Sequence, residues 1–215
     1  MKYLIWFIFT LLFTSLAHSQ NPTAEVIIDR SVAFHDPSNH WQSLIASLSF
    51  IEERETGDRR TTFNIDNTRG QFIFQRDSIT HGMLLDSCFN ISGETNCDRI
   101  QTIRNYYLYL WGLPMKLKDA NTPIINEVIE LKDWEEHKVY GVQVNYEREN
   151  WTFYFDQTTY ALVGYQFYFN YKDGGEVIVL KDIVEFEGIK FPKTRTWHTL
   201  PEEKYLATDE LQEIK

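Results

Sequence analysis

Basic residues and cysteines are scarce in this sequence, and their scarcity argues against several functions. The 21 lysines and arginines are outnumbered by 31 aspartates and glutamates, for a formal net charge of −10, and no basic stripe is visible. Such a chain repels phosphate backbones and anionic lipid surfaces, so nucleic acid is not expected as a partner. No cluster of cysteines or carboxylates completes a metal site. We therefore expect neither a metal nor another cofactor.

Familiar catalytic motifs are also missing. There is no Gly-x-Ser-x-Gly motif, and no glycine-rich phosphate loop follows a predicted strand. The adjacent carboxylates Glu52-Glu53 and Glu135-Glu136 would face opposite sides of a strand, so we expect solvated edges there rather than acid–base partners. These absences favour a protein that is not an enzyme.

The first 19 residues have the pattern of a secretory signal peptide. Lys2 gives a positive start, a short apolar core runs from residue 4 to residue 13, and Ala17 and Ser19 are the small residues that a signal peptidase reads. The apolar core is shorter than the roughly 20 residues of a membrane span, and no later run is long enough. We expect cleavage after Ser19, a periplasmic or secreted protein and one domain over residues 20–215. An uncleaved anchor over residues 1–19 is the alternative.

The two cysteines, Cys88 and Cys97, are nine positions apart. In an oxidising compartment this spacing predicts a disulfide. Two free thiols, or a redox pair, are the alternatives. A redox pair usually has two residues between its cysteines rather than eight, which favours a structural bridge.

Two stretches have helical spacing. Asn21-Pro22 offers a cap followed by proline at the first helical position, and Asp36-Pro37 ends that helix. The second helix begins near residues 96–98 and is stopped by Gly112 and Pro114. Its apolar stripe consists of Ile100, Ile103, Tyr107, Leu110 and Trp111.

Most of the remaining sequence alternates with period two, which predicts short strands separated by turns. Two helices cannot cover both faces of roughly ten strands, so the sheet must close or curl on itself. A strongly curved antiparallel sheet with its helices on the concave side would use every element and leave an apolar hollow. The expected strands lie near residues 44–50, 63–65, 72–74, 83–88, 128–131, 140–146, 151–155, 163–169, 178–180, 194–199 and 205–211.

Several segments resemble known families. The strand–turn–strand pattern of residues 151–162, followed by residues 186–192, resembles the half-barrel periplasmic proteins related to LolA and LolB, the lipoprotein carriers. Residues 33–37, 107–117 and 193–197 look similar to a family of uncharacterised secreted Bacteroidota proteins. The resemblance implies a mostly β (α+β) fold, an antiparallel, unclosed half-barrel with helices on its concave side and an apolar cavity for acyl chains. It does not imply the same cargo.

Aromatic residues make up 15% of the chain, and many fall on predicted strands at period two. Either they fill an ordinary core as cross-strand pairs, or some of them line an open cavity. Both interpretations stay open at this point. The candidates for a cavity wall are Trp111, Trp151, Phe153, Phe155, Tyr165, Phe167 and Phe169.

His35 and Asp36 are the polar-site candidates. His35 shares the apolar face of the first helix, where it would either bind a headgroup in the hollow or cap the helix end while Asp36 turns the chain.

The sequence as a whole favours non-catalytic binding of a lipid or a lipidated protein in the periplasm. An enzyme using His35 and Asp36 is one alternative, and a structural partner of envelope proteins is another. The sequence does not predict an oligomeric state.

Overall fold

The structure is a computed structural model that describes residues 22–126 and 131–215, and the side chains of residues 131 and 132 are not described. The predicted signal peptide, its cleavage site after Ser19 and Asn21 lie outside these residues. No helix within the two described ranges is long and apolar enough to cross a membrane.

One antiparallel sheet contains all the strands of the described residues. Its strands follow the order β5-β4-β3-β2-β1-β12-β11-β10-β9-β8-β7-β6, so the two outermost strands are not paired with each other and the sheet is unclosed. The strands are β1 Ile45–Glu53, β2 Arg59–Asp66, β3 Gln71–Arg76, β4 Ile79–Leu84, β5 Ser87–Ser92, β6 Leu131–Trp134, β7 His137–Asn145, β8 Glu149–Asp156, β9 Leu162–Phe169, β10 Gly175–Phe186, β11 Ile189–Leu200 and β12 Tyr205–Ile214.

The last strand joins the two halves of the sheet. Strand β12 pairs with β1 on one side and with β11 on the other, and every other neighbouring pair is a hairpin between consecutive strands. The N-terminal strands therefore reach the C-terminal strands only through β12. Side chains from both ends of the sequence consequently meet on the face above β12.

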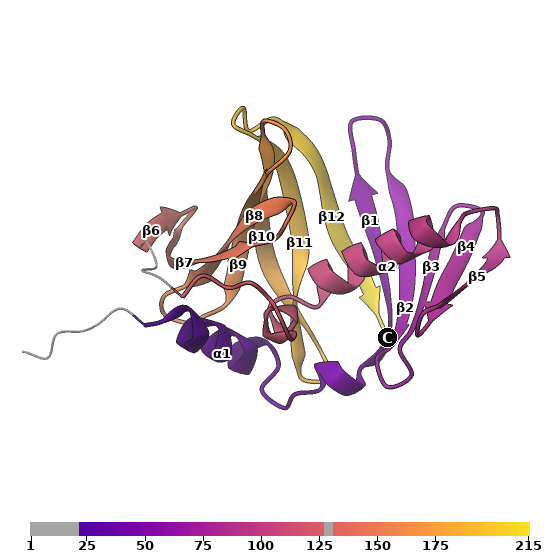
Figure 1. Cartoon of the computed structure of the whole chain (residues 1–215), viewed down its shortest axis with the longest axis horizontal. Coiled ribbons are helices and arrows are strands. Elements are labelled where there is room, and N and C mark those ends of the chain that lie inside the picture. Colours follow the sequence, from indigo (N-terminus) through magenta and orange to yellow (C-terminus); the bar gives the residue numbers. More distant parts are fainter. Residues whose placement is uncertain (1–21, 127–130) are drawn as a thin grey trace, which may run out of the picture.

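Both helices lie on the same face of the sheet, and the sheet curls around them (Figure 1). Helix α1 (Ala24–His35) begins at Thr23, whose Oγ1 accepts a hydrogen bond from the Val26 amide, and ends at Asp36. The prediction that Asp36-Pro37 ends this helix is confirmed. The predicted cap was wrong, because Thr23 occupies the cap position and Pro22 precedes it.

Helix α2 (Cys97–Trp111) crosses the middle of the sheet (Figure 1). Asn96 caps it by accepting a hydrogen bond from the Arg99 amide, and Gly112 ends it, as the sequence predicts. A disulfide joins Cys97, in the first turn of α2, to Cys88 on β5, with 5.7 Å between their Cα atoms. This bond fastens the start of α2 to the edge of the sheet. Two short 3₁₀ helices, Trp41–Ser43 and Met115–Lys118, complete the described elements.

The core lies between the two helices and the inner face of the sheet. Along each strand every second side chain faces inward, since successive residues of a strand point to opposite faces. Leu48 and Phe50 of β1, for example, are fully buried, and Phe50 packs against Phe63 of β2 and Trp111 of α2. The structure therefore confirms the predicted fold class, a mostly β, unclosed antiparallel sheet with two helices.

One strand prediction was wrong. Residues 83–88 were expected to form a single strand, but they contain the turn between β4 and β5. Leu85 makes this turn with a φ of 53°, which few non-glycine residues adopt, and the turn signal in the sequence is limited to Asp86 and Ser87. Of the strand expected near residues 128–131, residues 128–130 lie outside the described part of the chain, and β6 begins at Leu131.

Candidate ligand-binding cavity

A cavity of about 670 Å³ lies between α2 and the inner face of the sheet. Strands from both halves of the sheet contribute to its wall, and α2 forms its roof. The lining residues are Glu52, Arg54, Arg59, Phe74, Arg76, Arg99, Thr102, Ile103, Tyr106, Tyr107, Tyr109, Leu110, Glu149, Trp151, Phe167, Glu176, Trp197, Leu206, Ala207 and Asp209.

The apolar part of the wall consists mainly of aromatic rings. Trp151 of β8 stacks on Phe167 of β9 with 4.6 Å between ring centroids, and Tyr109 of α2 meets the same tryptophan edge-on at 5.7 Å. Tyr106 of α2 lies parallel to Trp197 of β11 at 6.3 Å and remains 46% exposed. Exposed aromatic surface in a cavity favours contact with an apolar ligand, because burying it removes apolar area from water.

Charged residues gather where β1, β2 and β3 meet α2. Glu52 of β1 is only 2% exposed, and both of its carboxylate oxygens are engaged. Arg59 Nε donates to it at 2.5 Å, Thr61 Oγ1 donates at 2.7 Å, and Arg76 pairs with it through Nη2. Tyr107 of α2 donates to the same carboxylate and accepts from Arg76, so this polar cluster connects the sheet to the helix.

The pKa of Glu52 is set by opposing effects. Burial alone would raise the pKa of its carboxyl, but the hydrogen bond from Thr61 and the positive charges of Arg76 and Arg59 lower it below the ordinary value. Glu52 therefore stays ionised at neutral pH. Its charge holds the surrounding guanidinium groups in place.

The floor of the cavity contains a second polar group. Asp209 of β12 lies directly opposite Glu52 in the β1–β12 pairing and accepts a hydrogen bond from Trp197 Nε1 at 3.2 Å. Burial and the neighbouring Glu52 charge raise the pKa of Asp209 to about 6. Beside it, Arg195 is buried with its guanidinium 3.7 Å from the centre of a Trp111 ring. A cation over an indole face is a favourable contact in a dry site.

The aromatic candidates divide between the cavity and the core. Trp151 and Phe167 line the cavity. Phe169 is partly buried and packs against the core. The other four fill the core and are at most 2% exposed, namely Trp111, Phe153, Phe155 and Tyr165.

His35 and Asp36 lie away from this cavity and serve the backbone. His35 is 1% exposed, and its ring nitrogens meet the Lys190 carbonyl at 2.7 Å and the Leu162 amide at 3.0 Å. Because the amide is a donor and the carbonyl an acceptor, Nδ1 carries the proton. The carboxylate of Asp36 accepts the amides of His40 and Trp41, which turns the chain after α1. Neither side chain keeps a free atom for a headgroup or a substrate.

A second hollow of about 480 Å³ borders the end of α1 and strands β6 to β11. It contains a pair that the sequence did not single out, His137 and Asp156, with 3.0 Å between Nδ1 and Oδ2. The other Asp156 oxygen accepts three hydrogen bonds from Thr158 and Thr159 in the β8–β9 turn. This carboxylate therefore has a structural task. No group of three or more metal-ligating side chains lies together in the described residues.

The charged cluster of the cavity is what sequence reasoning missed. Glu52 and Glu53 were expected to be solvated together, and for Glu53 the expectation is right, but Glu52 is buried. Continuing the period-two alternation of Leu48 and Phe50 by one step places Glu52 inward. The alternation also places Arg59 and Arg76 inward, on the same faces of their strands as Phe63 and Phe74.

The fold and cavity can now be compared with known proteins. Residues 2–214 match a family of unknown function, DUF6503. The chain belongs to the DUF6503 family. No curated protein matches this DUF6503 chain.

Solved structures share the fold of this DUF6503 protein at low sequence identity. A LolA superfamily protein from Nitrosomonas europaea is 8% identical and has a TM-score of 0.50, with 91% of this chain and 94% of the other covered. A domain of an outer membrane lipoprotein-sorting protein from Vibrio parahaemolyticus is also 8% identical, with a TM-score of 0.51 and coverage of 89% and 92%. At this identity the likeness establishes the fold and leaves function to the site.

Proposed function

We propose that this DUF6503 protein is a non-catalytic binding or carrier protein for a hydrophobic or amphipathic ligand, either a lipid or the lipid part of a lipidated protein. The observation that carries the proposal is the cavity between α2 and the sheet. Its volume of about 670 Å³ falls within the range of small-molecule sites. Its wall combines stacked aromatic rings with a few charged groups, which is the composition of a site for an amphipathic molecule.

The fold likeness supports the proposal. One of the similar structures is described as an outer membrane lipoprotein-sorting protein domain, and another as a LolA superfamily protein. Carrying a lipid or lipoprotein is therefore a function that this architecture can accommodate. The present cavity supplies the site that such a function needs.

The periplasm is the compartment that we propose for this function. The predicted signal peptide and the Cys88–Cys97 disulfide both favour an oxidising compartment outside the cytoplasm. An aqueous compartment between two membranes is also where a carrier for an apolar molecule is needed, because a free acyl chain is poorly soluble in water.

The expected affinity is moderate. Burying a twelve-carbon chain is worth about 9 kcal/mol, at about 0.8 kcal/mol per methylene. The loss of translational and rotational freedom on association offsets much of this gain. We therefore expect dissociation constants in the micromolar range, which suits a carrier that must also release its ligand.

Filling the cavity tests the proposal directly. Ala207 of β12 lines the cavity and is only 6% exposed, so Ala207→Phe would place a ring inside it. We expect this variant to bind a fluorescent fatty acid at least about tenfold more weakly than the unchanged protein, a loss of about 1.4 kcal/mol. Native mass spectrometry of gently purified protein, with lipid extraction of the same sample, would show whether a lipid is carried from the cell.

A matched control lies one residue away. Thr208 follows Ala207 on β12 and points to the outer face, so Thr208→Phe adds the same ring to the same strand without entering the cavity. Equal binding by both variants would show that the fatty acid does not use this cavity. If neither the unchanged protein nor either variant binds an amphiphile, the better hypothesis is that the chain binds another protein. The exposed side chains of Leu85 and Ile91 near the β5 edge would then form part of the contact surface.

A further inference from the structure

The cavity wall has two differently charged ends. Four arginines line the end formed by β1, β2, β3 and the start of α2, and three of them share one buried carboxylate, Glu52. Glu149 of β8 and Glu176 of β10 line the opposite end. Six steps of the sheet order separate β2 from β8, so the two ends are distinct parts of the site. The four arginines are Arg54, Arg59, Arg76 and Arg99, and we call them the arginine end.

Positive charge is in excess at the arginine end. Glu52 is the carboxylate partner of three guanidinium groups, at 3.5 Å from Arg54 and 2.5 Å from Arg59, with Arg76 also in contact. Within the described residues Arg99 has no carboxylate within 4.0 Å. Asp209, which lies opposite Glu52 in the β1–β12 pairing, adds a second carboxylate, but the buried Arg195 lies beside it. The positive charges therefore still outnumber the negative ones at this end, and a site for an anion remains.

Hydrogen-bond donors are also left over. Arg59 reaches Glu52 through Nε alone, and neither of its terminal nitrogens meets an acceptor within the part of the chain that the structure describes. Arg54 likewise approaches Glu52 through Nε. A guanidinium offers five N–H groups in a planar fork that suits the paired oxygens of a carboxylate or a phosphate. The side chains of Arg59 and Arg54 are 34% and 40% exposed, so a ligand can reach them.

Two of the guanidinium groups at the arginine end, those of Arg59 and Arg76, are already held in position before a ligand arrives. Glu52 fixes Arg59 and Arg76, and Thr61 and Tyr107 bind Arg76 in turn. Ordering a flexible arginine side chain costs conformational entropy, and here that cost is met on folding rather than on binding. The aromatic rings Phe74 and Trp197 continue the wall from the arginine end toward the middle of the cavity.

We infer that the arginine end binds the anionic headgroup, a carboxylate or a phosphate, of an amphipathic ligand whose apolar chain lies along the aromatic wall. This inference rests on the proposed function and adds the charge and orientation of the ligand. The carboxylates of Glu149 and Glu176 at the far end repel an anion, so they favour one orientation of the ligand over its reverse.

Chain-matched amphiphiles test the charge preference. Dodecanoate and dodecyl phosphate carry the two anionic headgroups, dodecanol is neutral, and dodecyltrimethylammonium is cationic. We expect both anions to displace a neutral fluorescent probe from the delipidated protein about tenfold more tightly than dodecanol, as charge-assisted hydrogen bonds add to the same chain burial. Tighter binding of only one anion would identify which headgroup the site prefers and still support the inference.

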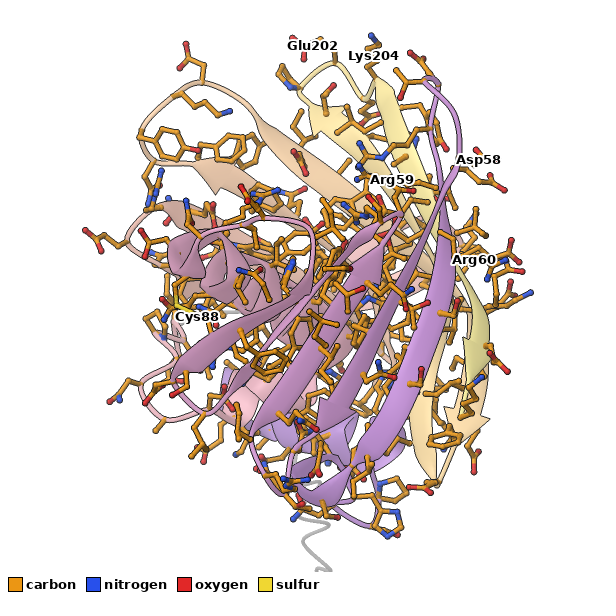
Figure 2. The ribbon with its side chains drawn as sticks, turned by 90° about the vertical axis from the view of Figure 1, so that its right-hand side faces the viewer. Asp58, Arg59, Arg60, Cys88, Glu202 and Lys204 are labelled. Carbon is orange, nitrogen blue, oxygen red and sulfur yellow. A yellow bond between two sulfur atoms is a disulfide. The ribbon has the colours of Figure 1, made fainter. Side chains whose placement is uncertain are left out.

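The double variant Arg54→Gln/Arg59→Gln tests the residues. Its dissociation constant for the anions should rise about tenfold to the level of dodecanol, while its affinity for dodecanol stays unchanged. Arg60→Gln is the control, since Arg60 follows Arg59 on β2, is exposed on the outer face and donates to Ser49. Figure 2 shows Arg59 and Arg60 leaving the strand in opposite directions. Circular dichroism and the melting temperature would show that the double variant is folded.

The possible failures point to different errors. Equal affinity for dodecanoate and dodecanol, unchanged by the double variant, would overturn the headgroup assignment and leave the cavity as an apolar site. Tighter binding of the cationic amphiphile would also overturn it and assign the headgroup to Glu149 and Glu176. If none of the four amphiphiles binds, and Ala207→Phe changes nothing, the proposed function itself fails.

Discussion

His35 is held in its neutral form by burial and by two backbone groups. His35 Nδ1 donates a hydrogen bond to the Lys190 carbonyl, and the Leu162 amide donates one to Nε2. A second proton on Nε2 would face that amide hydrogen with no acceptor. Burial lowers the pKa of His35 to about 4, with the nearby Lys190 charge acting in the same direction against the raising effect of the Lys190 carbonyl.

The stability of the protein should therefore depend on pH through His35. In the unfolded chain the imidazole takes up a proton below its ordinary pKa of 6.5, whereas in the folded protein it resists protonation until about pH 4. The unfolded state thus binds more protons in this window, and stability falls as the pH drops through it. Between pH 7.5 and 5 we expect His35 to remove about 2 kcal/mol from the free energy of unfolding.

A non-titrating variant isolates this contribution. His35→Gln should lose about 1–3 kcal/mol at pH 7.5, because a buried backbone group loses its partner, and should lose less on acidification than the unchanged protein. Guanidinium unfolding at pH 7.5 and pH 5 measures both effects. His40→Gln is the control, since the His40 side chain is exposed and its one hydrogen bond within the described residues is to the Glu187 carbonyl. Parallel pH profiles for the unchanged protein and His35→Gln would contradict this account.

For single residues, the sequence predicts which face of a strand a side chain occupies better than it predicts what that side chain does. The alternation along each strand is enough to place Trp151 and Phe167 inward. It cannot tell that Phe153 and Phe155 are covered while Trp151 lines a cavity, because α2 supplies the cover from a distant part of the chain. The partners of His35 are 127 and 155 residues away in sequence, so its structural role is invisible without the fold.

Helix α2 is the element on which both the core and the cavity depend. Tyr107 and Trp111 pack against Phe50 of β1 and Phe63 of β2. Tyr107 also lines the cavity, together with Thr102 and Tyr106. The Cys88–Cys97 disulfide holds its first turn against β5 (Figure 2). Movement of this helix would change the core and the cavity together.

Removing the disulfide should destabilise the protein. In the chain-entropy model, a bridge that closes a loop of this length contributes about 2–3 kcal/mol, and we expect Cys88→Ser/Cys97→Ser to lose that amount in guanidinium unfolding. Thiol titration of the denatured, unreduced protein should find no free thiol. Two free thiols per chain, or a double variant as stable as the unchanged protein, would show that the bridge has no such role. Ser87→Ala, next to Cys88 and exposed, serves as the control.

Helices and strands are largely predictable where the residues that begin and end them are typical caps or turn residues. Asn96 and Gly112 mark the ends of α2, and polar or glycine turns separate most strands. The β4–β5 turn is missed because Leu84 and Leu85 are apolar at the position of the turn, and a residue type that rarely takes positive φ makes it.

At the scale of the whole molecule, the cavity exists because the sheet has more inner face than its helices cover. Two helices lie on a sheet of twelve strands, and the space beside α2 stays open between β1–β3 on one side and β8–β12 on the other. That some hollow must form follows from counting predicted strands and helices. Its position does not, because it depends on the pairing of β12 with β1, which joins the two ends of the sequence.

A ligand in the cavity should therefore stabilise the whole molecule by completing its core. A ligand that binds only the folded state adds RT ln(1 + [L]/Kd), which is about 2.7 kcal/mol at a free concentration one hundred times the dissociation constant. For a chain of this size, that gain corresponds to a rise in melting temperature of roughly 5–10 °C. We expect dodecanoate to produce this shift in the delipidated protein and in Thr208→Phe. In the cavity-filling variant Ala207→Phe, binding that is at least tenfold weaker leaves at most about 1.4 kcal/mol of stabilisation, so the shift should be about half as large or smaller. An equal shift in Ala207→Phe would place the stabilising ligand elsewhere on the molecule.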